Sequence, residues 1–98
     1  MIKNLLENPL KITHLEADIN YTVFHLIDGK KSVSSYTLKH FEQLLAHSNS
    51  NFIRIHRGYI INISHITSKT ENEVTLVGDV VIPFARRRRF QNLQFTNI

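Results

Sequence analysis

The arginines of this sequence are the residues whose type and spacing point most directly to a binding chemistry. All six lie in residues 50–98, as Arg54, Arg57 and the run Arg86 to Arg89. That half of the chain carries seven basic residues against three acidic ones, whereas residues 1–49 carry five of each. The planar guanidinium fork suits phosphate oxygens and guanine edges better than the point charge of lysine does. A polyanionic partner is therefore expected, and nucleic acid is the commonest one.

The same arginines also have simpler interpretations. A run such as Arg86 to Arg89 is often only a solvated surface, but this one directly follows a predicted β-hairpin, which would hold its first member on a rigid element. Arg54 could point to solvent from a strand, and His56 could either approach DNA or orient a turn. The alternative from another functional class is a protein-interaction module whose basic half binds an acidic partner.

Catalytic and metal-binding chemistries find little support in the sequence. The chain has no cysteine, which excludes disulfides and thiolate ligands. Its six histidines are scattered without the HExxH spacing of zinc enzymes, and no GxSxG nucleophile motif occurs. The three glycines are isolated from one another, so they predict no phosphate-binding loop. We expect no enzymatic activity, no metal, no cofactor and no small-molecule substrate.

The length and composition indicate one small domain. Ninety-eight residues, of which 42% are hydrophobic, can form a core and fold alone. The first residues do not resemble a signal peptide, and no segment reaches the roughly 18 apolar residues of a membrane span. The sequence therefore predicts a cytoplasmic protein.

The elements that must position the arginines are mainly β-strands. β-Branched and aromatic residues are frequent in three segments, 11–18, 21–28 and 30–36. Because Asp28-Gly29 is also a hairpin signal, these segments predict a meander of three strands. Residues 37–48 predict the one amphipathic helix, with Thr37 as its N-cap. At helical spacing, its apolar face would consist of Leu38, Phe41, Leu44 and Leu45.

The second half of the chain predicts further strands. Residues 52–56 read as a strand, whereas 58–66 are ambiguous between a short helix and extended chain. Residues 66–70 and the hairpin 73–84 follow, with Gly78-Asp79 as a two-residue turn and Pro83 ending the last strand. Residues 85–98 predict a basic loop or a short helix. With one clear helix, a helix-turn-helix protein is excluded, and the aromatic motifs of an RRM are absent.

The sequence FIRIHRGYIINISHI, residues 52–66, resembles the core motif of the LytTR DNA-binding domain of bacterial transcription regulators. LEADINYTVFHLIDGK, residues 15–30, is similar to the Glu-Ala and Tyr-Thr strand pair of this family with its Asp-Gly turn. GDVVIPFARRR, residues 78–88, is similar to the Ile-Pro-Val-Ser-Arg segment of the family. These matches follow one another in order along nearly the whole chain.

This resemblance implies an elongated, mostly antiparallel β-assembly, a sandwich or barrel with one amphipathic helix and a short C-terminal helical segment. It implies a LytTR-like domain over residues 11–98, with 1–10 as a lead-in. We expect no receiver domain ahead of residue 11, and hence either a stand-alone regulator or a separated output domain. Family members bind DNA through loops that enter successive major grooves of direct-repeat sites and bend the DNA. We therefore expect a nucleoid-associated protein that places two copies on a promoter site.

Specific contacts follow from the same resemblance. Asn20 would contact adenine, and Arg57 and Arg86 would each contact guanine. Tyr21 and His56 would lie near the DNA or orient these side chains. From charge and neighbourhood alone, further residues are candidates for phosphate contacts: Lys30, Lys31, Arg87, Arg88 and Arg89. Two positions depart from the family pattern, because Gly58 and Ala85 stand where a serine is usual, and each removes a hydroxyl that could donate to a phosphate.

Overall fold

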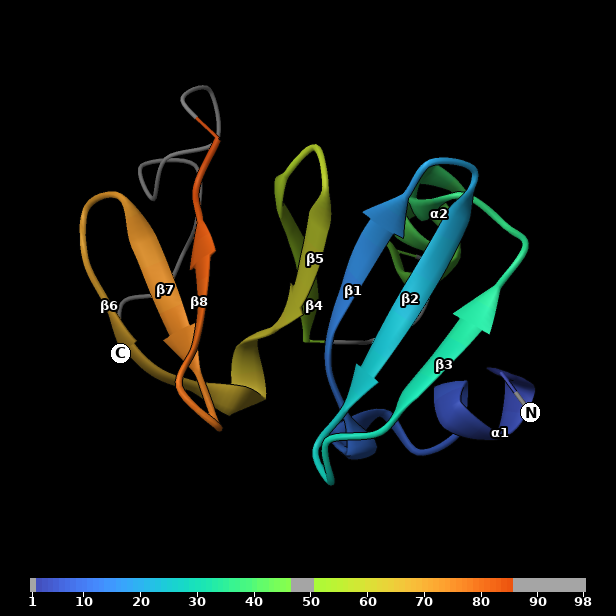
Figure 1. Cartoon of the computed structure of the whole chain (residues 1–98), viewed down its shortest axis with the longest axis horizontal. Helices are drawn as coiled ribbons and strands as arrows, with labels where there is room; N and C mark the ends of the chain where they lie inside the picture. The colour runs from blue at the N-terminus through green and yellow to red at the C-terminus, as the bar shows by residue number, and fades with distance from the viewer. Residues whose placement is uncertain (1, 47–50, 86–98) are drawn as a thin grey trace.

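The computed structural model describes residues 2–46 and 51–85 of the chain. Within these residues the fold consists mainly of antiparallel strands arranged in two sheets (Figure 1). The five-stranded sheet has the order β3-β2-β1-β5-β4 and contains β1 (Ile12–Asp18), β2 (Tyr21–Leu26), β3 (Lys31–Ser34), β4 (Phe52–His56) and β5 (Tyr59–Asn62). The three-stranded sheet contains β6 (Ile66–Lys69), β7 (Glu73–Leu76) and β8 (Val80–Pro83). The predicted mainly β architecture is therefore confirmed, including the meander of the first three strands.

Helix α2 (Leu38–Ala46) covers one face of the five-stranded sheet. The prediction of Thr37 as its N-cap is confirmed, since the Thr37 hydroxyl accepts a hydrogen bond from the His40 amide at 3.3 Å. Leu38, Phe41 and Leu45 are buried, but Leu44 remains 45% exposed. The expected apolar face was thus one residue too wide, because the sheet covers a narrower stripe of the helix than periodicity alone suggests.

Strand β5 joins the two halves of the hydrophobic core. Successive side chains of a strand point to opposite faces, and both Ile60 and Ile61 are buried. Ile60 packs with the residues beneath α2, among them Phe24 and Phe41. Ile61 packs with Ile55 and with the apolar side chains of the three-stranded sheet. The five-stranded sheet is therefore a central layer with α2 on one face and the smaller sheet on the other.

The segment that the sequence left ambiguous contains both conformations. Residues 59–62 form β5, and a short 3-10 helix, η2 (Ile63–His65), follows it. Buried Asn62 satisfies the backbone here: its side-chain amide donates to the carbonyls of Pro9 at 3.1 Å and Ile12 at 2.9 Å, and its oxygen accepts from the Ser64 amide. Asn62 thus links β5 to the start of the chain, as a backbone-satisfying turn residue is expected to do.

The segment before β1 and the β7–β8 turn differ from expectation. The sequence did not predict the short helices α1 (Ile2–Leu6) and η1 (Pro9–Lys11) before β1. The β7–β8 hairpin pairs Leu76 with Val80, so three residues form its turn rather than two. Gly78 and Asp79 in this turn both have positive φ, as tight hairpins often require. Pro83 does end β8, and the predicted C-terminal helical segment lies outside the described residues.

Candidate nucleic-acid interface

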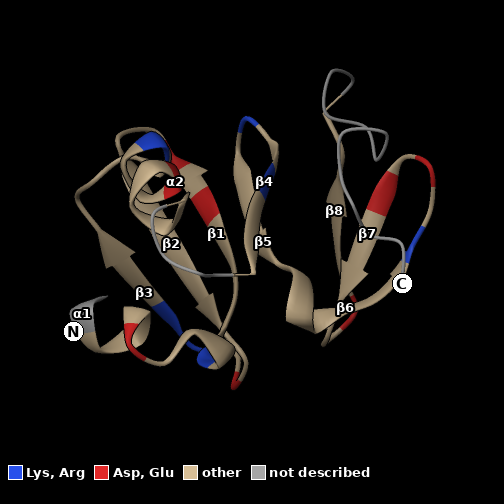
Figure 2. Ribbon diagram, turned by 180° about the vertical axis from the view of Figure 1, so that it is seen from behind, with Lys and Arg blue, Asp and Glu red and all other residues tan. Residues whose placement is uncertain are grey.

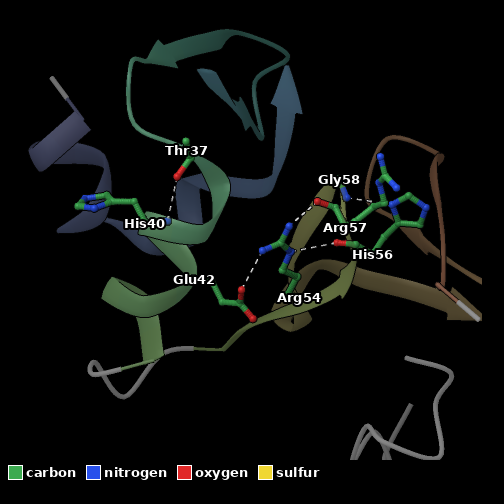
Figure 3. Close-up of polar contacts among 7 residues, drawn as sticks. All are labelled: Thr37, His40, Glu42, Arg54, His56, Arg57 and Gly58. Carbon is green, nitrogen blue, oxygen red and sulfur yellow. Dashed lines mark hydrogen bonds and ion pairs between the residues drawn. The ribbon is translucent and has the colours of Figure 1, made fainter. Parts of the chain in front are cut away.

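The turn between β4 and β5 carries Arg57 at its tip (Figure 3). The two strands pair from Phe52 opposite Asn62 up to His56 opposite Tyr59, which leaves Arg57 and Gly58 as a two-residue connection. A register shift between Arg54 and His56 adds a bulge just before the turn, a feature that increases local twist and redirects side chains. The Arg57 side chain is exposed. It is therefore presented to solvent at the end of a paired hairpin.

Arg54 holds the backbone of this turn from one side. Its guanidinium donates to the carbonyl oxygen of His56 at 3.2 Å and to that of Arg57 at 2.5 Å. A third donor makes an ion pair of 2.8 Å with Glu42 on α2. Figure 3 shows these contacts converging on the one guanidinium. Arg54 therefore does not simply point to solvent from its strand, and it braces the turn against the helix.

Other hydrogen bonds fix the turn from within and from β1. His56 Nδ1 accepts a hydrogen bond of 3.0 Å from the Gly58 amide, so this histidine orients the turn. The Gly58 carbonyl accepts from the Ala17 amide at 2.8 Å, which extends the pairing of β1 with β5 as far as the turn. This hydrogen bond is the contact that an orienting role of His56 requires, and an approach of His56 to DNA stays a prediction.

The β1–β2 turn presents Asn20. Asp18 pairs with Tyr21, so Ile19 and Asn20 form a two-residue connection. Asn20 is exposed and Tyr21 is 52% exposed, whereas the following Thr22 is buried and donates to the Tyr36 carbonyl at 2.8 Å. The base of the turn is therefore anchored to the segment that leads into α2, and its tip is open to solvent.

The end of β8 lies against the β4–β5 hairpin. The amide of Ala85 donates to the carbonyl of Ile55 at 2.8 Å, two residues before Arg57. The next residue is Arg86, which lies with Arg87, Arg88 and Arg89 outside the described residues. The chain therefore enters its arginine run from a point bonded to β4, the strand that leads into the turn with Arg57.

These three segments share one end of the molecule. Figure 1 shows the β1–β2 turn, the β4–β5 turn and the end of β8 at the top of the view. Lys30 and Lys31 lie in and after the β2–β3 turn, at the other end of the five-stranded sheet. A strand of six residues such as β2 spans about 20 Å. The structure therefore groups Asn20 with Arg57 and separates both from the two lysines.

The charges at the shared end are mixed (Figure 2). Lys39 is exposed in the first turn of α2, a position that charge counting did not single out because it lies in the balanced half of the chain. Among the acidic residues, Glu42 is paired with Arg54, and Glu16 contacts His25 at 2.8 Å and the Tyr59 hydroxyl at 3.4 Å. Exposed Asp18 precedes the β1–β2 turn. Glu71 and Glu73 lie at the β6–β7 turn, where Glu73 pairs with Pro83 at the end of β8. Of these acids, Glu42 and Glu16 are engaged by neighbouring side chains.

Two histidines of the five-stranded sheet, buried His14 and partly buried His25, form a ring stack. The rings of His14 and His25 are parallel, with centroids 4.1 Å apart. Burial, and secondarily the charge of His25, lowers the pKa of His14 from 6.5 to about 4, although Glu16 opposes the shift. Burial and then the adjacent Glu16 raise the pKa of Tyr59. No group of three or more potential ligands that could hold a metal occurs among residues 2–46 and 51–85.

Comparisons with known proteins agree with the mainly β fold. The family model of the LytTr DNA-binding domain matches residues 3–94. Among solved structures, the chain is similar to the LytTr DNA-binding domain of a Bacillus cereus protein assigned as a methyl-accepting/DNA response regulator. The identity is 26% and the TM-score 0.68, and the match covers 80% of this chain and 73% of the other. No curated protein sequence matches the chain. In the described residues, no helix has the length and apolar content of a membrane span.

Proposed function

The chain belongs to the LytTR DNA-binding domain family, and from that premise we propose that it reads promoter DNA through the turns at one end of its sheets. DNA binding and transcription regulation follow from the family itself. The proposal concerns how the DNA is read: the β1–β2 turn, the β4–β5 turn and the segment after β8 enter successive major grooves of a direct-repeat site.

The observation that carries this proposal is the braced β4–β5 turn. The Arg54 guanidinium donates to the carbonyls of His56 and Arg57. The Gly58 amide donates to the His56 ring, and the Gly58 carbonyl accepts from the Ala17 amide. The side chain of Arg57 stays exposed. A base-reading side chain gains from such support, because a fixed backbone leaves less freedom to lose on binding.

The proposed contacts divide into base and phosphate contacts. Arg57 and Arg86 each have the bidentate donors that recognise O6 and N7 of guanine, and Asn20 has the amide that recognises adenine. Arg87, Arg88 and Arg89 would neutralise phosphates beside them. Lys30 and Lys31 lie at the other end of the sheet, so they would contact phosphates only if the DNA curves around the sheet, as the family resemblance implies. No catalytic step is part of this function.

The proposed arrangement on DNA is two copies on one site. Each copy would occupy one repeat, with the repeats in the same orientation. A solution dimer is not required, because adjacent repeats bring the copies together. A DNA target of this kind places the protein in the bacterial cytoplasm, with the nucleoid.

In-vitro selection of bound sequences with the full chain tests the proposal. We expect a selected motif that occurs twice in the same orientation, and DNA with the motif shuffled should compete at least about a hundredfold less well. Competition by random DNA as effective as by selected DNA would contradict sequence-specific reading. Tight binding to an acidic protein, together with such unselective DNA binding, would favour the protein-interaction module.

A further inference from the structure

Ile19 occupies an unusual position at the tip of the β1–β2 turn. Its side chain is 90% exposed, more than any other large hydrophobic residue in the described part of the chain. Its neighbour Asn20 is also exposed, and Tyr21 is half-exposed. Ile19 therefore contributes almost nothing to either hydrophobic core, although isoleucine is among the residues most often buried.

The backbone of Ile19 is also in a conformation that isoleucine disfavours. Its φ is +56°, in the left-handed region, where a β-branched side chain is a genuine outlier. A positive φ at the first turn residue alone matches the type II′ pattern, in which this position is usually glycine. Glycine or asparagine would form the hairpin with less strain and would not expose an apolar surface. Neither folding nor solubility accounts for isoleucine here.

We propose that Ile19 is a specificity-determining residue that contacts the methyl group of a thymine in the major groove. The inference rests on the proposed function, since it places the β1–β2 turn against bases. The C5-methyl of thymine is the one apolar group that base pairs display in the major groove, and aliphatic side chains recognise it by contact. Strained backbone residues that persist at functional sites fit the same interpretation.

The position of Asn20 narrows the choice of thymine. If Asn20 contacts an adenine, the side chain of Ile19 lies next to it at the same tip. The thymine would then be the partner of that adenine or its immediate neighbour. One A·T pair or step would be recognised by hydrogen bonds from Asn20 and by apolar contact from Ile19.

Substitution of deoxyuridine for thymine tests the proposal, because it removes only the methyl group. Each thymine of a selected site is replaced in turn, and the affinity is measured by fluorescence anisotropy for the wild type and Ile19→Ala. We expect one position at which the wild type loses about three- to fivefold in affinity, the effect of one buried methyl. Ile19→Ala should bind the thymine site about as weakly and show no further loss with deoxyuridine.

Ile27→Ala is the matched control. Ile27 is 54% exposed in the β2–β3 turn, at the other end of the sheet, and this variant should keep the full sensitivity to deoxyuridine. Ile19→Gly adds a readout of strain: it should unfold at no lower temperature than the wild type while binding more weakly.

The outcomes separate this inference from the proposed function. Sequence-specific binding with no methyl-sensitive position would overturn the role of Ile19 and leave DNA reading intact. The role of Ile19 is also overturned if Ile19→Ala remains as sensitive to deoxyuridine as the wild type. It is overturned again if Ile19→Ala weakens only the joint binding of two copies, which would place Ile19 between proteins. If the wild type bound selected and shuffled DNA equally well, the proposed function itself would be overturned.

Discussion

The guanidinium of Arg54 donates a hydrogen bond to the main-chain carbonyl of Arg57. One arginine thus holds the backbone from which the other projects. The same guanidinium is paired with Glu42, so the position of the β4–β5 turn depends on the packing of α2 (Figure 3). Arg54 therefore supports the turn from a partly buried position, whereas Arg57, three residues later, is exposed at the tip of the turn.

Replacing Arg54 should damage both stability and DNA binding. Arg54→Ala removes its bonds to two carbonyls and to Glu42, and we expect the free energy of unfolding to fall by about 2 kcal/mol. A loosened turn should also lower DNA affinity by about tenfold, or about 1.4 kcal/mol. Urea denaturation and fluorescence anisotropy measure the two effects.

Arg54→Lys provides the control, since it keeps the charge but not the planar fork. If Arg54 acts by bracing the turn, lysine should recover little of either loss. Full recovery of affinity by lysine would show that only its charge matters. Arg57→Ala should lower affinity without changing stability, because its side chain is exposed.

Serine at position 58 should be tolerated and should strengthen DNA binding. Gly58 does not have a positive φ, and an added Cβ would meet only the His56 ring, at 3.4 Å from Nδ1. We expect Gly58→Ser to change stability by no more than about 0.5 kcal/mol. Its hydroxyl adds a donor for a phosphate, so affinity should rise about three- to tenfold.

Gly58→Ala separates the effect of the hydroxyl from that of the Cβ, and it should leave affinity near the wild-type value. Equal affinity of the serine and alanine variants would exclude a phosphate contact at this position. Gly29→Ala is the contrasting substitution, because Gly29 has φ of +87° and alanine there should lower stability by about 1 kcal/mol.

Acid should weaken the fold through His14. Because the pKa of His14 is about 4 in the folded chain and 6.5 ordinarily, the unfolded chain binds more protons between these values. The contribution of neutral His14 to the free energy of unfolding is fully present above pH 6.5 and is lost as the pH falls towards 4. The loss amounts to up to about 3 kcal/mol. The His14 ring shares a hydrogen bond of 2.8 Å with the Thr13 hydroxyl. The titratable groups near it are His25, Glu16 and Tyr59, and Lys30 lines the same cavity of about 290 Å³.

Urea denaturation of the wild type and His14→Gln from pH 7.5 to 4 measures this effect. The variant cannot take up the proton, so its stability should fall less steeply in this window. Parallel curves for the two proteins would assign the acid sensitivity to other groups.

The fold was largely predictable from local patterns. Alternating β-branched residues and turn signals located the strands, and Thr37 marked the start of α2, because these features act within a few residues. The three-residue turn at Gly78 and the exposure of Leu44 were missed. They depend on strand register and on which neighbour covers a helix, and neither is encoded locally.

The candidate site was predictable only in part. The residues in the turns were identifiable by family resemblance, and Arg57 and Asn20 do lie exposed at one end of the sheets. The role of Arg54 was not visible, because its partner Glu42 lies on a different element twelve residues earlier. The position of Lys30 and Lys31 likewise follows from the length of β2 and not from their charge.

Base and phosphate contacts in the arginine run should differ in their salt dependence. Arg87→Ala should weaken binding about equally on all sequences and lower the slope of log affinity against log salt by about 1. Arg86→Ala should instead cost about 1–3 kcal/mol at the selected site and relax the preference at one base pair. Binding to selected and shuffled DNA across a salt series measures both. A uniform loss for Arg86→Ala would reassign it to a phosphate.

The central claim is that Arg57 reads a guanine in the major groove from the braced turn. Substitution of 7-deazaguanine for each guanine of the selected site removes only the N7 acceptor. At one guanine the wild type should lose about tenfold in affinity. Arg57→Ala should already bind more weakly there and lose nothing further. If Arg57→Ala remains as sensitive as the wild type at every guanine, Arg57 does not read one, and the central claim is contradicted.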